Sequence, residues 1–178
     1  MSLRSPLSSA RRAGLAVAAG ALLITAAGAP AGAAPGDFSA DTVVANVGVN
    51  SAISLAGLTP AFTLNGLPGA TIAEVGAVAY TVLTNNVGGY TVTVQAEDAT
   101  LEPAGDSTDN IAIGALAVRA GGNGAYTPLS NTSAVILRDK DTRSAAAGDD
   151  YADDYQVAIP FVADDTYSVT LNYIATAS

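Results

Sequence analysis

The chain has 178 residues, of which 49% are hydrophobic and 13% are charged, and it contains neither histidine nor cysteine. This composition excludes a disordered chain, and it excludes Ser-His-Asp hydrolysis, thiol catalysis and zinc or haem ligation by His or Cys for the chain acting alone. Sixteen acidic residues against seven basic ones give a formal net charge of −9, so nucleic acid is not an expected partner.

The first 33 residues have the three parts of a secretory signal peptide. Arg4, Arg11 and Arg12 form a positive region, residues 13–27 are apolar, and small residues end at Ala31-Gly32-Ala33. A transmembrane helix is the alternative, but the apolar run is short and interrupted by glycines. We therefore expect residues 1–33 to be a signal peptide, residues 34–178 to form one domain, and the protein to be secreted.

The mature part is strongly acidic and cannot form disulfides. All sixteen acidic residues but only four basic ones follow Ala33, which gives the mature part a formal net charge of −12. Without cysteine, its stability must come from core burial and sheet hydrogen bonds. No second hydrophobic span follows the signal, so no membrane insertion is expected after signal removal.

Short segments with period-two alternation predict an all-β domain. The clearest are residues 90–96, 155–161 and 167–173, in which Tyr90, Val92, Val169 and Leu171 are predicted core residues. Weaker candidates are residues 42–47, 52–55, 61–64, 71–75, 78–84, 113–119 and 134–138. About ten short antiparallel strands are typical of a single immunoglobulin-like β-sandwich.

Three polar segments are predicted to connect these strands. Residues 85–89, Asn-Asn-Val-Gly-Gly, tolerate the positive φ of tight turns and indicate a hairpin loop between the flanking strands. Residues 97–110 and 138–154 are long and polar, and we expect both to be surface loops.

The densest acidic region lies at the end of the second long segment. Asp149, Asp150, Asp153 and Asp154 fall within six residues, which makes them a candidate weak calcium site of the extracellular kind. The alternative is an ordinary acidic loop, neutralised by Arg138, Lys140 and Arg143. The spacing does not match an EF-hand, and no other cofactor is indicated.

Two segments resemble the WxL-type domains of bacterial surface proteins, which are exported, β-rich and associated with the cell wall. Residues 85–94 are similar to the turn and first W-x-L strand of that family, and residues 166–175 to its C-terminal strand. Tyr90-Thr91-Val92 and Tyr173-Ile174-Ala175 stand at the positions of the two motifs. The resemblance implies an exported sandwich located at the cell surface or wall.

These observations favour a non-enzymatic surface protein that acts by binding or assembly. Expected partners are a cell-wall polymer, other surface proteins or further copies of the chain. One alternative is a structural subunit that assembles into a filament or layer by donating or accepting a strand, because open sheet edges are templates for pairing. A carboxylate-dependent glycan hydrolase is the other alternative, since that chemistry needs only two acids.

The signal peptide makes a direct prediction about the exported protein. Mass spectrometry of the protein from the producing culture should find an N-terminus close to Ala34, because Ala31-Gly32-Ala33 is the best cleavage motif. Recovery of intact Met1 in the mature pool would contradict this prediction.

Overall fold

The computed structural model describes residues 41–178 with the exception of Asn123. The chain divides into two units, residues 1–46 and residues 47–178. Of the first unit, the described residues 41–46 are exposed and form neither helix nor strand. The predicted signal peptide lies outside the described residues.

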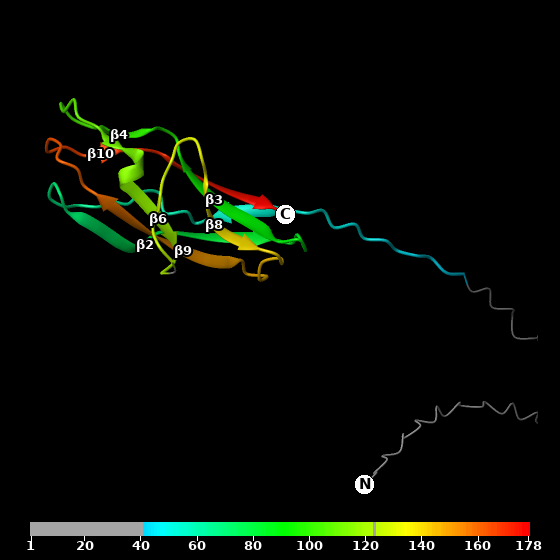
Figure 1. The fold of residues 1–178 in the computed structure, drawn as a ribbon. Coiled ribbons are helices and arrows are strands. Elements are labelled where there is room, and N and C mark those ends of the chain that lie inside the picture. The colour runs from blue at the N-terminus through cyan, green and yellow to red at the C-terminus, as the bar shows by residue number, and fades with distance from the viewer. Residues whose placement is uncertain (1–40, 123) are drawn as a thin grey trace, which may run out of the picture. The chain divides into compact units, whose positions relative to one another are not determined.

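The second unit consists of antiparallel β-sheets (Figure 1). Its only helical element among the described residues is the 3-10 turn η1 (Ile113–Ala115). The strands are β1 (Ile53–Ala56), β2 (Thr71–Thr84), β3 (Tyr90–Ala96), β4 (Thr100–Pro103), β5 (Ile111–Ala112), β6 (Leu116–Ala120), β7 (Thr127–Pro128), β8 (Val135–Lys140), β9 (Asp149–Ala158), β10 (Tyr167–Ser168) and β11 (Leu171–Ala177).

Three sheets contain these strands. The largest has the order β1-β2-β9-β6-β7, and the other two have the orders β11-β3-β8 and β10-β4-β5. The rows of side chains on β2 and β9 and those on β3 and β11 belong to one hydrophobic cluster. Tyr80 of β2 and Tyr173 of β11 meet across it, with ring centroids 5.5 Å apart.

The predicted alternation is confirmed on β3. Tyr90, Val92 and Val94 are fully buried, whereas Thr91 and Thr93 on the opposite face are not. The C-terminal segment alternates in the same way, but the ladder is interrupted at Val169 and Thr170, so that β10 and β11 belong to different sheets. Val169 and Leu171 are half-buried and pack against the core.

Two predicted connections are wrong. Residues 85–89 are not a hairpin loop, because β2 and β3 lie in different sheets and the segment crosses between them. Residues 97–110 are not simply a loop, because they contain β4 with Leu101 buried. Turn residues specify a change of direction, but they do not specify which strand will be the hydrogen-bonded neighbour.

Some predicted strand bounds also change. Residues 71–75 and 78–84 form one strand, β2, with a bulge between Glu74 and Val78. Residues 42–47 and 61–64 form no strand, although Phe62 and Leu64 keep their alternation and pack on the core. The strand predicted to reach Phe161 ends at Ala158, and the Phe161 ring is exposed.

The core assignment predicts unequal effects of one substitution at two leucines. Leu116 is 5% exposed and Leu67 is 78% exposed. Leu116→Ala should lower the free energy of unfolding by about 2–5 kcal/mol, since it removes buried methyl groups and leaves a cavity. Leu67→Ala should change it by no more than about 0.5 kcal/mol. Denaturant unfolding measures both, and equal effects would contradict the described packing.

Candidate functional site

The acidic run that the sequence singled out forms the first half of β9. Because side chains alternate along a strand, Asp149, Tyr151 and Asp153 share one face, and Asp150 and Asp154 share the other. Asp149 lies opposite the buried Val82 and Asp153 opposite the buried Val78. Since directly opposed residues face the same way, Asp149 and Asp153 point into the core.

A bulge in β8 places two cations above these carboxylates. Val92 of β3 is paired with Arg138 and Thr93 with Ile136, so Leu137 is one extra residue on β8. Arg138 and Lys140 are therefore opposite Val92 and Tyr90, the inward residues of β3. Both cations project from the β11-β3-β8 sheet toward β9 of the five-stranded sheet.

Asp153 forms a buried ion pair with Arg138. The distance from Arg138 Nη2 to Asp153 Oδ1 is 2.7 Å, and the side chains are 14% and 0% exposed. Arg138 also donates to the carbonyl of Ala152 and lies over the Tyr151 ring, 4.5 Å from its centroid. Burial raises the pKa of Asp153, and the Arg138 charge opposes this rise. The guanidinium is thus the main group that keeps a carboxylate stable inside the core.

Asp149 is the second charged group of the network. Its Oδ2 accepts hydrogen bonds from Lys140 Nζ at 2.7 Å and Tyr90 Oη at 2.6 Å, and its Oδ1 accepts one from the Ala145 amide at 3.1 Å. The Lys140 and Tyr90 bonds hold the pKa of Asp149 at about 2, against an ordinary 3.8. Asp149 is therefore ionised throughout the neutral range.

Tyrosine hydroxyls complete this buried network. Tyr90 bonds to Tyr151 at 2.6 Å, and Tyr155 bonds to Tyr173 at 2.7 Å. Burial raises the pKa of Tyr90, Tyr155 and Tyr173, and also of Tyr80, whose hydroxyl has no hydrogen-bond partner among the described residues. The hydroxyls of Tyr90, Tyr155 and Tyr173 therefore stay protonated at neutral pH and take part in the network as hydrogen-bonding groups, not as bases.

Asp154 has a different role on the opposite face of β9. Three residues of β2, Val75 to Ala77, bulge out opposite this single aspartate. Its carboxylate accepts from the Gly76 amide at 2.8 Å, the Gly122 amide at 3.0 Å and Arg119 Nε at 2.8 Å, and it is 1% exposed. Burial opposes ionisation, but these three donors leave the pKa of Asp154 lowered. The carboxylate thus binds the Gly76 amide, which the bulge has freed from the ladder, and the Gly122 amide of the turn after β6.

The surface-loop interpretation of residues 138–154 is wrong, because both of its ends lie in strands. Asp149 and Asp153 point inward to separate cations, Asp154 binds the bulge, and Asp150 is exposed and accepts a bond from Thr81 Oγ1 at 2.6 Å. Within the described residues, no three acidic side chains gather where they could hold a metal ion. The ion pairs of Arg138 with Asp153 and of Lys140 with Asp149 match the alternative to calcium, in which nearby cations neutralise the aspartates. Arg143 forms no ion pair within the described part of residues 41–178.

The sequence did not reveal this network, although one signal was present. Every second residue before Tyr155 and Val157 belongs to the same row, which therefore also contains Asp153, Tyr151 and Asp149. Read as a strand, that row predicts two buried carboxylates. Arg119 was not expected as a partner of Asp154, since their pairing depends on the contact between β6 and β9.

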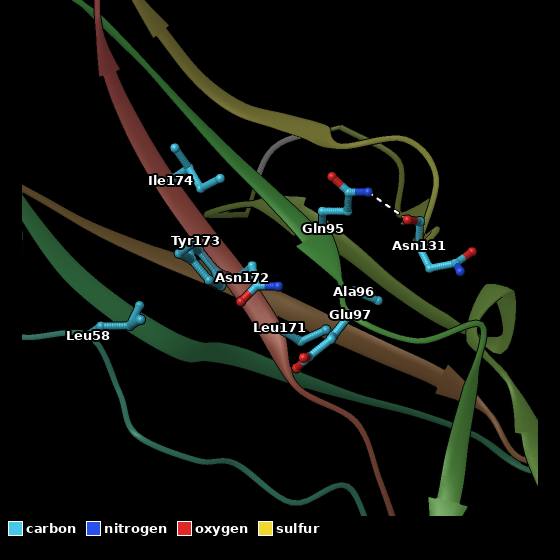
Figure 2. Close-up of a pocket in the computed structure, with 9 residues that line it drawn as sticks. All are labelled: Leu58, Gln95, Ala96, Glu97, Asn131, Leu171, Asn172, Tyr173 and Ile174. Atoms are coloured by element: carbon cyan, nitrogen blue, oxygen red, sulfur yellow. Dashed lines mark hydrogen bonds between the residues drawn. The ribbon is translucent and has the colours of Figure 1, made fainter.

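A separate surface hollow of about 570 Å³ lies beside β11 (Figure 2). Leu58, on the segment that follows β1, lies across from Leu171, Tyr173 and Ile174 of β11, and residues of β3 and Asn131 border its other end. Gln95 Nε2 donates to the Asn131 carbonyl at 2.7 Å and fixes that end. The hollow combines apolar side chains with a strand edge.

No protein-family model matches the chain, and a search of the curated proteins finds no significant match. Among residues 41–178 without 123, no helix has the length and apolar character needed to span a membrane.

The Arg138–Asp153 pair makes a prediction about stability. Arg138→Met should lower the free energy of unfolding by about 3–5 kcal/mol, because it leaves the Asp153 carboxylate buried without its counter-charge. Arg143→Met, the same change at an exposed arginine, should cost no more than about 0.5 kcal/mol. Chemical denaturation at pH 7 measures both. A small, equal effect at the two positions would show that the ion pair is not buried in solution.

Proposed function

We propose that the chain is a non-enzymatic, exported protein of the cell surface or cell wall, built as an immunoglobulin-like β-sandwich and acting by binding or assembly. The observation that carries this proposal is the edge of β11, which pairs with a strand only on its β3 side and borders the hollow; β1 lies close to this edge without pairing with it. Such an edge offers backbone donors and acceptors together with apolar side chains, which is how sheet proteins recruit an extended partner.

The sandwich is supported by the way the two larger sheets share one core. Inward rows on β2 and β9 meet inward rows on β3 and β11, and the Arg138–Asp153 bond joins β8 to β9. Two antiparallel sheets with interdigitating inner faces define this architecture. The predicted signal peptide and the segments that resemble WxL-type domains support a location outside the cell.

A binding role accounts for the placement of the charged groups better than a hydrolytic one. A glycan hydrolase needs two carboxylates that flank the scissile bond of the substrate. Asp149, Asp153 and Asp154 instead point toward protein cations and amides, and Asp153 and Asp154 are buried. Their contacts are those of residues that stabilise a scaffold.

Fractionation and sedimentation test this proposal. The protein should be recovered from the medium or wall fraction of the producing culture. Purified residues 34–178 should either sediment with isolated walls or form oligomers at micromolar concentration. A protein that remains in the cell interior, or that stays monomeric and binds no wall material, would contradict the proposal. Release of sugars from wall or storage glycans would favour the hydrolase instead.

A further inference from the structure

The segment before β1 carries an uncovered row of valines. Val43, Val47 and Val49 are 94%, 88% and 80% exposed, and every residue from 41 to 52 is exposed. Single exposed apolar residues are common, but a contiguous set marks a surface that another molecule covers. No residue from 42 to 73 is charged, so the segment enters an apolar contact without a desolvated charge.

This valine row has the register of a strand. Val43, Ala45, Val47 and Val49 alternate with Val44, Asn46, Gly48 and Asn50. The same odd-numbered positions continue into β1, where Ile53 and Leu55 are half-buried and pack against the core. The segment is therefore patterned as an extension of β1 with one apolar face.

The ladder within the chain stops before this extension. Ile53 is paired with Thr84, the last residue of β2, so the ladder ends there. Before Ile53, β2 contributes only the bond that Thr84 Oγ1 donates to the Ala52 carbonyl, at 2.7 Å. Asn85 makes the last contacts: its side chain accepts from the Ala52 amide and donates to the Asn50 carbonyl. Residues 43–51 would span about 30 Å when extended, enough to pair with a strand of ordinary length.

One strand edge in the described sheets lacks charge, proline and shortness as protection against such pairing, although β1 lies close to part of it without pairing. Exposed edges are usually blunted by charge, proline or shortness. β8 carries Arg138, Asp139 and Lys140, β7 contains Pro128, and β1, β5 and β10 have four residues or fewer. β11 has seven residues, Leu-Asn-Tyr-Ile-Ala-Thr-Ala, with no charge and no proline.

The backbone of β11 points free hydrogen-bonding groups at this edge. Glu97 donates to the Thr170 carbonyl, and the Ser178 amide donates to Gly89, so even-numbered residues are those that bond to β3. Bonded residues alternate along an antiparallel strand, so Leu171 and Tyr173 direct their N–H and C=O groups away from β3. β1 ends at Ala56, and beyond it the hollow borders these two residues.

We propose that residues 43–51 of one molecule bind as an added strand along β11 of a second copy, with Val47 and Val49 covering the hollow that Leu58, Leu171 and Tyr173 line. This inference rests on the proposed assembly function and names its partner as the chain itself. Every copy carries both the donor segment and the acceptor edge, and the contact joins two different surfaces. Repetition therefore produces an open chain of molecules and not a closed dimer.

Valine substitutions test the donor segment. In residues 34–178, Val47→Asn with Val49→Asn should weaken self-association at least ten-fold by sedimentation velocity. The control is Val75→Asn with Val87→Asn, which removes two other exposed valines, 76% and 81% exposed, and should leave association unchanged. Melting temperatures of both variants should stay near the parent value, because neither pair is in the core. Equal weakening by both pairs, or by neither, would overturn the proposal.

Cysteine cross-linking tests the acceptor edge, since the chain has no cysteine of its own. Asn46→Cys protein mixed with Asn172→Cys or Ile174→Cys protein should form a disulfide-linked pair under mild oxidation. Mixing with Ile136→Cys on the opposite edge strand β8 should not. Preferential linkage to β8 would overturn the proposal, as would an intramolecular disulfide in monomers that carry both Asn46→Cys and Ile174→Cys.

The two proposals fail in different ways. If the parent protein neither associates nor binds wall material, the proposed function fails and this inference fails with it. If the parent protein assembles but the Val47→Asn with Val49→Asn variant assembles equally well, this inference alone fails. It also fails alone if the parent protein binds walls only as a monomer.

Discussion

The carboxylates of β9 that face the core are the constraint on which the arrangement of the two larger sheets depends. Asp153 is fully buried, and a buried charge is tolerated only with a partner of opposite charge and good geometry. Its partner Arg138 comes from β8 in the other sheet, 2.7 Å away. An apolar core would permit several relative positions of two sheets, whereas this pair, together with Lys140 and Asp149, favours the position in which the opposite charges meet.

Both ladder irregularities are connected to these charges. The single extra residue in β8 directs Leu137 inward beside Arg138, so the strand can supply an apolar side chain and a cation to the core. The wider bulge in β2 frees the Gly76 amide, which Asp154 binds from the outer face of β9. Bulges of this kind re-aim side chains without ending the strand. Adjacent aspartates thus stabilise opposite faces of one strand.

The interior and the edge of the molecule have opposite properties. Inside, ionisable groups are paired and tyrosine hydroxyls are held protonated by burial. At the edge, β11 presents free backbone groups and no charge, and the segment before β1 presents valines that the described residues leave exposed. An internally neutralised scaffold with one long, uncharged edge strand is suited to pairing with an extended polypeptide, and the net negative charge of the chain opposes nonspecific contact elsewhere.

The period-two alternation of the sequence determined the all-β class and showed which side chains of a strand face the core. Alternation placed Tyr90, Val92 and Val94 in the core and Thr91 and Thr93 outside it, because side-chain direction in a strand depends only on a period of two. What pattern could not supply was pairing. It made residues 85–89 a hairpin and residues 138–154 a loop, since a polar run of aspartates reads as solvated unless its partners are known. Only the tertiary structure brings Arg138 to Asp153 and Arg119 to Asp154, because the stability of a buried charge depends on long-range neighbours and not on the residues beside it in sequence.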